Sequence, residues 1–266
     1  MTPVAVITGA SSGIGTELAR VFARNGHRLA LVARREARLK ALAAEIAAAG
    51  QPEPLTLAVD LGQPDAAARI GETLVGHALE PEYVVNNAGF GLVGKAAVLD
   101  RDEQLAMIDL NMRTLTDLSL AFVDSLKRRR GGVLNVASVA GFLPGPSSAV
   151  YFASKAYVLA FSEALHVELK PQGVRVTCLC PGPVLTEFQA RARIRDPRPS
   201  SRLTLSAERV AAEGYRGLMR GRRVVVPGVA NKLVTMLLPR LAPRSVLMAV
   251  LEARQSKRDG SLVPTT

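Results

Sequence analysis

The chain of 266 residues contains no tryptophan, only two cysteines, and aromatic residues at just 4% of its length. Acidic residues are also in deficit, because 23 Asp and Glu stand against 34 Lys and Arg and leave a formal net charge of +11. The positive charge alone could suggest that the protein binds nucleic acid. Aromatic side chains are scarce, however, and no known nucleic-acid-binding motif is present, so we do not expect such binding. We interpret the basic excess as an arginine-rich surface together with a site for an anionic cofactor.

The two cysteines, Cys178 and Cys180, are two positions apart in an apolar run, so they share one face of a predicted strand. That spacing is too short for an ordinary disulfide within a strand, and no metal-ligand residues accompany them. We expect buried free thiols in a reducing compartment and no metal site. The N-terminus shows no signal peptide, and no apolar run reaches the roughly 18–20 residues that span a bilayer. The cytoplasm is the expected location.

Short apolar runs alternate with longer helical patterns along the chain. Several of these runs are β-branched at consecutive positions, which is typical of strands covered by helices on both faces. We predict strands at 4–8, 28–33, 55–59, 83–86, 133–137, 174–179 and 224–226. We predict helices at 14–25, 36–49, 65–78, 103–127, 152–169 and 207–219. The alternation predicts an α/β fold, a doubly wound, Rossmann-like parallel sheet with helices on both faces.

The same pattern indicates one domain over residues 1–228, in which 184–206 form a substrate loop rich in Pro, Arg and Ser. Residues 229–266 form a basic amphipathic C-terminal extension. Two interpretations of the extension stay open. It is either a helix pair that packs on the sheet edge or on a neighbouring subunit, or a segment that rests on an anionic membrane surface.

Tyr151 and Lys155 are four residues apart in a predicted helix, so their side chains share one face. An ammonium beside a phenol favours the phenolate, and we therefore expect the pKa of Tyr151 to lie below its usual value of about 10. A phenol tuned in this way can exchange a proton with an alcohol or carbonyl oxygen near neutral pH.

A glycine-rich turn, Thr8–Gly15, joins the first predicted strand to the first predicted helix. Its glycines allow a diphosphate to approach the backbone closely, and the helix amides and dipole meet the negative charge. The spacing G-x-x-x-G-x-G differs from the usual dinucleotide fingerprint, and the Lys of a P-loop is missing. About 20 residues further on, where NAD enzymes carry an acidic residue, the chain has Arg34 and Arg35. A guanidinium there can bind a 2′-phosphate, which favours NADP(H) over NAD(H).

Over about residues 3–230 the chain resembles the short-chain dehydrogenase/reductase family. The motifs that carry the resemblance are Thr8–Gly15, Asp60-Leu61, Asn86-Asn87-Ala88-Gly89, Pro181-Gly182-Pro183 followed by Thr186, and the four residues Asn111, Ser138, Tyr151 and Lys155 at the positions of the family's catalytic tetrad. The cofactor-binding residues that we predict are Gly9, Ser11, Ser12, Gly13, Ile14, Gly15, Arg34, Arg35, Asp60, Leu61, Asn87, Ala88, Gly89, Tyr151, Lys155, Pro181, Gly182, Val184 and Thr186.

The resemblance also implies a role for each member of the tetrad. Hydride passes between the nicotinamide and the substrate carbon while Tyr151 handles the proton of the oxygen. Lys155 lowers the pKa of the tyrosine and hydrogen-bonds the nicotinamide ribose. Ser138 donates to the carbonyl oxygen, and Asn111 holds a water that connects Lys155 to solvent.

The sequence thus predicts an NADP(H)-dependent oxidoreductase that reduces a ketone or aldehyde, with a lipid-like or acyl substrate left open. The alternative is a non-catalytic NADP(H)-binding sensor or scaffold of the same fold. The resemblance implies a homodimer or homotetramer, assembled through the predicted helices 103–127 and 152–169. Peripheral membrane contact through the C-terminal extension is the remaining predicted interaction.

Overall fold

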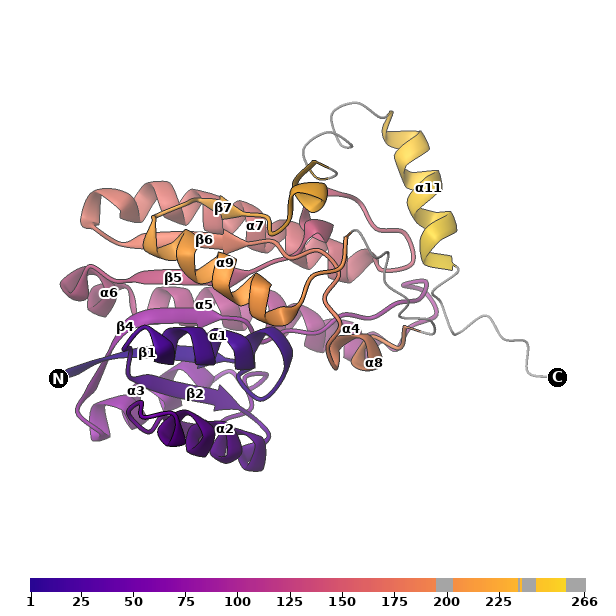
Figure 1. Ribbon diagram of the computed structural model, residues 1–266. Helices are drawn as coiled ribbons and strands as arrows, with labels where there is room; N and C mark the ends of the chain where they lie inside the picture. The colour runs from indigo at the N-terminus through magenta and orange to yellow at the C-terminus, as the bar shows by residue number, and fades with distance from the viewer. Residues whose placement is uncertain (195–202, 234, 236–242, 257–266) are drawn as a thin grey trace.

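The computed structural model describes residues 1–194, 203–233, 235 and 243–256. Within them a parallel sheet of seven strands has the order β3-β2-β1-β4-β5-β6-β7 (Figure 1). The strands are β1 (Thr2–Thr8), β2 (Leu29–Ala33), β3 (Leu55–Ala58), β4 (Leu79–Asn86), β5 (Gly132–Val136), β6 (Arg175–Leu179) and β7 (Val224–Val225). The strand order reverses between β1 and β4, and open α/β sheets bind ligands at the carboxyl ends of the strands at such a point.

Helices cover both faces of this sheet (Figure 1). One face is covered by α1 (Gly13–Arg24), α2 (Glu36–Ala48) and α9 (Ala207–Met219). The other is covered by α3 (Ala66–Gly76), α5 (Leu115–Ala121), α6 (Val123–Arg129) and α7 (Ala149–Leu169). The predicted doubly wound, Rossmann-like fold is confirmed.

Strand β1 shows why consecutive apolar residues suit this fold. Val4 and Val6 pack into the core on one side of the sheet, whereas Ala5 and Ile7 pack into the core on the other side. Successive side chains of a strand point to opposite faces, so a strand between two helix layers is apolar at every position.

Two predicted elements differ from the structure. Strand β4 begins at Leu79 rather than at residue 83, and its pairing with β1 skips one residue after Pro81. Proline has no backbone N–H to donate to the neighbouring strand, so the strand pairing is irregular beside Pro81. The pattern of apolar residues does not reveal this irregularity.

The predicted helix 103–127 is also broken into several pieces. Helix α4 (Arg101–Ile108) passes into a π-helical turn, η1 (Asp109–Thr114), before α5 begins. A further break at Phe122, where the backbone leaves helical geometry, separates α5 from α6. Single π-turns of this kind are frequent at functional sites, and Asn111 lies within this one.

The cysteine prediction is confirmed, because Cys178 and Cys180 are buried, free thiols whose sulfur atoms lie 3.6 Å apart. In the C-terminal extension, helix α11 (Arg244–Ser256) lies beside the carboxyl end of the sheet rather than along its edge (Figure 1). Parts of two predicted segments, 195–202 of the substrate loop and 234, 236–242 and 257–266 of the extension, lie outside the described residues.

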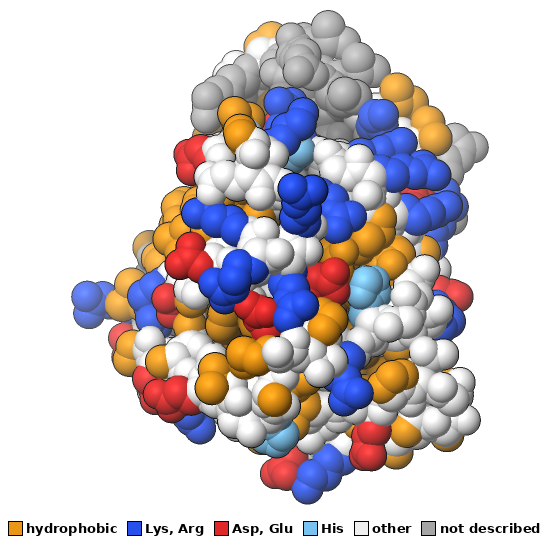
Figure 2. Space-filling model, turned by 90° about the vertical axis from the view of Figure 1, so that its left-hand side faces the viewer, with side chains coloured by type: hydrophobic (Ala, Val, Ile, Leu, Met, Phe, Trp, Pro, Cys, Tyr) orange, Lys and Arg blue, Asp and Glu red, His pale blue; other side chains and the backbone are white. Residues whose placement is uncertain are grey.

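The face at the amino ends of the strands carries Lys and Arg side chains next to Asp and Glu (Figure 2). Glu80 illustrates this mixing, since its carboxylate pairs with Arg128 at 2.8 Å and with Arg129 at 2.6 Å. At this position two arginines are therefore paired locally with one carboxylate. No helix in the described part of the chain has the length and hydropathy needed to cross a bilayer.

Candidate active site

A cavity of about 1060 Å³ opens at the carboxyl ends of the central strands. Apart from Gly15 and Asn111, every predicted catalytic and cofactor-binding residue lines it. The residues come from segments that are far apart in the chain, and the parallel topology gathers them because all the strands end at the same edge.

The glycine-rich turn forms one wall of this cavity. Gly9 has a positive φ of 65°, which an ordinary side chain rarely adopts. A Cβ on Gly15 would collide with the carbonyl oxygen of Gly9, so the first turn of α1 packs directly on the turn before it. The Asn87 amide donates to the carbonyl oxygens of Thr8 at 3.0 Å and of Gly9 at 3.3 Å. The turn is thereby held open for a ligand that needs close contact with backbone amides.

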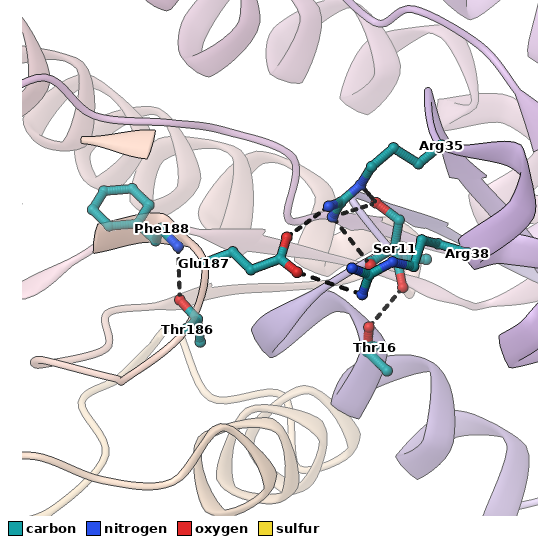
Figure 3. Close-up of polar contacts among 8 residues, drawn as sticks. Ser11, Thr16, Arg35, Arg38, Thr186, Glu187 and Phe188 are labelled. Atoms are coloured by element: carbon teal, nitrogen blue, oxygen red, sulfur yellow. Dashed lines mark hydrogen bonds and ion pairs between the residues drawn. The ribbon is translucent and has the colours of Figure 1, made fainter. Parts of the chain in front are cut away.

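Arginines gather at the end of β2, beside this turn. Arg35 donates from Nε to Ser11 Oγ at 3.2 Å and pairs through Nη1 with Glu187 at 2.6 Å (Figure 3). Arg38 also reaches the Glu187 carboxylate, at 3.4 Å. Among the described residues, the exposed Arg34 side chain has no hydrogen-bond or ion-pair partner.

Asp60 and Leu61 follow β3 on the adjacent rim of the cavity. The Asp60 carboxylate accepts a hydrogen bond of 3.0 Å from the backbone N–H of Gly62, which tightens the turn. The carbonyl oxygen of Leu61 accepts a hydrogen bond of 2.6 Å from the buried Thr114 hydroxyl. Both residues are therefore positioned by contacts within the protein while they face the cavity.

Ser138 and Tyr151 meet on the cavity wall. Ser138 caps the 3-10 helix η2 (Val139–Phe142), accepting from the Ala140 N–H at 3.1 Å, and it lines the same cavity as Tyr151. Burial raises the pKa of Tyr151 to about 12, and the polar Ser138 side chain only partly opposes that rise. The expected lowering of this pKa is thus wrong, because desolvation of the phenolate outweighs the stabilising contacts.

Lys155 lies one helical turn beyond Tyr151 on α7, with its ammonium 5.9 Å from the centre of the tyrosine ring. The two side chains share a face, as predicted. The ammonium donates to the carbonyl oxygen of Val136 at 3.0 Å. Burial lowers the pKa of Lys155 to about 8, and the neighbouring Cys178 and Cys180 partly offset this effect.

Asn111 lies behind the cavity wall, in η1, and is 1% exposed. Its amide donates to the Phe90 carbonyl at 2.9 Å and to Ser154 Oγ at 3.1 Å, and its oxygen accepts from the Phe90 N–H at 3.1 Å. Asn111 therefore ties η1 to the loop after β4 and to α7. Its role in holding a water stays a prediction.

The segment after β6 closes the opposite side. The Pro181 carbonyl accepts from the Val139 N–H at 2.9 Å, which ties this segment to η2. Val184 forms an isolated parallel bridge with Leu205. The short helix α8 (Phe188–Arg191) then places the Phe188 ring 5.6 Å from that of Tyr151.

Many of the side chains that line the cavity are apolar. Its lining includes Leu92, Leu110, Leu143, Phe152, Phe188 and Leu251. Arg191 also lines it, but its guanidinium stacks on the Phe90 ring at 4.4 Å and pairs with Glu103 at 3.2 Å. Within the described residues, no group of three His, Cys, Asp or Glu could hold a metal ion.

Arg38, Glu187 and Leu251 were not among the site residues predicted from the sequence. Glu187 meets Arg35 across 152 positions of the chain, and no local pattern marks such a contact. Leu251 belongs to the C-terminal extension, which we expected on the sheet edge, on another subunit or on a membrane. In the structure this residue reaches the cavity from α11. No periodicity of the extension could have indicated that position.

Comparison with known proteins gives independent information on this site. A family model described as short chain dehydrogenase matches residues 3–196. Sulfoacetaldehyde reductase 2 of Chromohalobacter salexigens is 37% identical over 191 residues, which cover 71% of this chain and 75% of that protein.

Solved structures of dehydrogenases are also similar to this chain. The short-chain dehydrogenase from Sphingobium yanoikuyae in complex with NADPH is similar with a TM-score of 0.78 and 31% identity over 99% of both chains. The bulky-bulky ketone specific alcohol dehydrogenase from Comamonas testosteroni is similar with a TM-score of 0.73 and 27% identity, over 99% of this chain and 96% of that one. Because the family model matches residues 3–196 and the fold is shared, the chain belongs to the short-chain dehydrogenase family and is an oxidoreductase.

Proposed function

We propose that this protein is an NADP(H)-dependent reductase of ketones or aldehydes. One observation carries the proposal: a single cavity joins the arginines after β2 to Ser138 and Tyr151, with Lys155 beside the tyrosine ring. The similarity to a dehydrogenase solved with NADPH supports the cofactor. The similarities to an aldehyde reductase and to a ketone-specific alcohol dehydrogenase support the reaction class.

The residues present fit a phosphorylated dinucleotide. The turn at Gly9 offers backbone amides at the N-terminus of α1, where a diphosphate is stabilised. Arg34 is exposed at the end of β2, where a forked guanidinium can bind a 2′-phosphate. When bound, the cofactor supplies a hydride from its nicotinamide ring.

Proton transfer falls to Tyr151. With a pKa of about 12 the phenol is protonated at neutral pH, so it can donate a proton to the carbonyl oxygen of a substrate. Ser138 is placed to hydrogen-bond the same oxygen, and the charge of Lys155 stabilises the phenolate left on Tyr151. The protonated phenol is the form that the reduction of a carbonyl requires.

The apolar side chains of the cavity lining favour an apolar substrate. Leu92, Leu143 and Phe152 offer no partner for a charged group, and burying an unpaired charge is costly. Arg191 is already paired with Glu103. We therefore propose an apolar ketone or aldehyde, with lipid-like and acyl compounds included in the test.

The test is a panel of ketones, aldehydes and acyl thioesters, assayed by loss of NADPH absorbance. Tyr151→Phe removes the proton donor and is expected to lower turnover by about 10²–10⁴ while NADPH still binds. The matched control is Tyr157→Phe on the same helix, because the Tyr157 hydroxyl pairs with Thr116 at 2.8 Å outside the cavity. Full activity in Tyr151→Phe would refute the assignment. NADPH binding without turnover of any compound would instead support the non-catalytic sensor.

We also propose that the protein assembles as a homodimer or homotetramer. Helices α4, α5 and α7 each expose an apolar side chain. The exposed fractions are 45% for Leu105, 52% for Leu120 and 63% for Val167. Contiguous exposed apolar surface marks interfaces. Light scattering after size exclusion measures the mass, and a monomer at micromolar concentration would contradict this.

The predicted contact of residues 229–266 with anionic membranes remains a proposal as well. Helix α11 exposes Val246 and Val250, at 53% and 58%. Co-sedimentation with anionic vesicles is expected for the full chain and is expected to be lost when the residues after Gly228 are deleted. Equal partitioning of both chains would refute the proposal.

A further inference from the structure

The Glu187 side chain lies across the arginines of the predicted cofactor site. Its two carboxylate oxygens point at two different guanidinium groups, Arg35 at 2.6 Å and Arg38 at 3.4 Å (Figure 3). Arg35 in turn holds Ser11 of the glycine-rich turn, through both its hydroxyl and its carbonyl oxygen at 3.2 Å. Glu187, in the segment after β6, is therefore paired with arginines that follow the end of β2.

The residues on either side of Glu187 extend this contact toward the catalytic group. Thr186 packs on the glycine-rich turn so closely that a Cβ on Gly13 would lie 2.9 Å from its Cγ2. Phe188 faces the Tyr151 ring at 5.6 Å. Thr186 thus packs on the glycine-rich turn, Glu187 pairs with the two arginines, and Phe188 lies beside the Tyr151 ring.

A guanidinium fork binds a carboxylate and a phosphate with the same geometry, so the two ligands exclude each other at one fork. The hydrogen bond from Arg35 lowers the pKa of Glu187, so this carboxylate is charged at neutral pH. Arg34 and Arg35 both line the cavity, whereas Arg38 does not.

We propose that Glu187 is a cofactor-specificity residue, whose carboxylate holds Arg35 and Arg38 and is displaced from Arg35 by the 2′-phosphate of NADP(H). The proposal rests on the NADP(H) preference proposed above. NAD(H) carries no group to take the place of the carboxylate, so its binding leaves the Glu187 contacts intact. Glu187 therefore lowers the affinity for 2′-phosphorylated ligands and leaves the affinity for the others unchanged.

The solvent exposure of the Glu187–Arg35 ion pair limits how much Glu187 can change the affinity for NADP(H). Arg35 is 44% exposed and Glu187 is 49% exposed, and exposed ion pairs are weak because water and salt screen them. Removing the competing carboxylate is expected to tighten binding by about two- to fivefold at low ionic strength.

The test compares wild type with Glu187→Gln in direct binding titrations against NADPH, NADH, 2′-AMP and 5′-AMP. The two mononucleotides probe the adenosine end alone, without contributions from the nicotinamide end. Glu187→Gln is expected to bind NADPH and 2′-AMP about two- to fivefold more tightly and to bind NADH and 5′-AMP as wild type does. The gain is expected to shrink at high salt.

The matched control is Glu36→Gln. Glu36 is the neighbour of Arg35 in the chain and pairs with Lys40 at 2.8 Å, so the substitution changes the local charge equally without releasing Arg35. We expect it to leave all four affinities unchanged. A double substitution, Arg35→Ala with Glu187→Gln, is expected to bind 2′-AMP no better than Arg35→Ala alone.

Three results would overturn the inference: weaker NADPH binding by Glu187→Gln, no change, or an equal gain for NADH. Weaker binding would mean that Glu187 holds the arginines in place for the phosphate. A different result would contradict the proposed NADP(H) preference itself. In that case wild type would bind NADPH no better than NADH, and 2′-AMP no better than 5′-AMP.

Discussion

Lys155 donates a hydrogen bond of 3.0 Å to the carbonyl oxygen of Val136, the last residue of β5. This bond anchors the ammonium at the end of a central strand, beside the ring of Tyr151. The partner is neutral, and the lysine is only 6% exposed. A buried ammonium without a carboxylate loses much of its hydration energy, and this loss explains the lowered pKa.

The pKa of Lys155, about 8, predicts how activity depends on pH. Below that value the ammonium is charged, and above it the lysine becomes neutral and no longer stabilises a phenolate on Tyr151. We expect kcat/KM for NADPH-dependent reduction to be constant near neutral pH and to fall as the pH rises through about 8. Lys155→Met is expected to be nearly inactive with no such step. Lys170→Met, at an exposed position, serves as the control. A wild-type profile that stays flat to pH 10 would contradict this prediction.

Gly15→Ala tests the packing of the glycine-rich turn. The added methyl group would collide with the carbonyl oxygen of Gly9, so the start of α1 must shift. Overpacking of this kind costs about 1–3 kcal/mol, and we expect a lower Tm and a loss of NADPH binding. Gly76→Ala, at the end of α3 with no atom within 4 Å of the new methyl group, is expected to retain both. Normal NADPH affinity in Gly15→Ala would show that the cofactor does not depend on this turn.

Arg34→Ala tests the proposed contact with the 2′-phosphate. We expect the KM for NADPH to rise about tenfold, because a charged hydrogen bond is lost, and the KM for NADH to change little. Steady-state kinetics with both cofactors measure this difference. Arg24→Ala, at the end of α1, provides a control for net charge. An equal rise for both cofactors would refute a contact specific to the phosphate.

Leu251→Ala tests whether α11 contributes to substrate selection. Leu251 lines the cavity, and truncating it is expected to remove packing against a large substrate but not against a small one. We expect kcat/KM to fall by about 5–30-fold for bulky apolar ketones and to stay close to wild type for small aldehydes. Val250→Ala, whose side chain is 58% exposed on the same helix, is the control. Equal losses for large and small substrates would indicate a general disturbance instead.

The fold was predictable because its signals are local. Consecutive apolar residues such as Val4, Ala5 and Val6 can be buried on both faces only between two helix layers. The errors occurred where long-range contacts override the local pattern. Pro81 is accommodated by its pairing with β1, and the turn at Asn111 is held by contacts with Phe90 and Ser154.

The sequence by itself determined the family, the doubly wound sheet and which residues gather at the carboxyl ends of its strands, because these depend on periodicity and on short motifs. Only the tertiary structure decided the protonation of Tyr151, the ion pair between Glu187 and Arg35, and the place of Leu251 in the cavity. A pKa depends on how much water the surrounding atoms exclude, and a contact across 152 positions depends on how the whole chain packs. Neither quantity is encoded in a local pattern of residues.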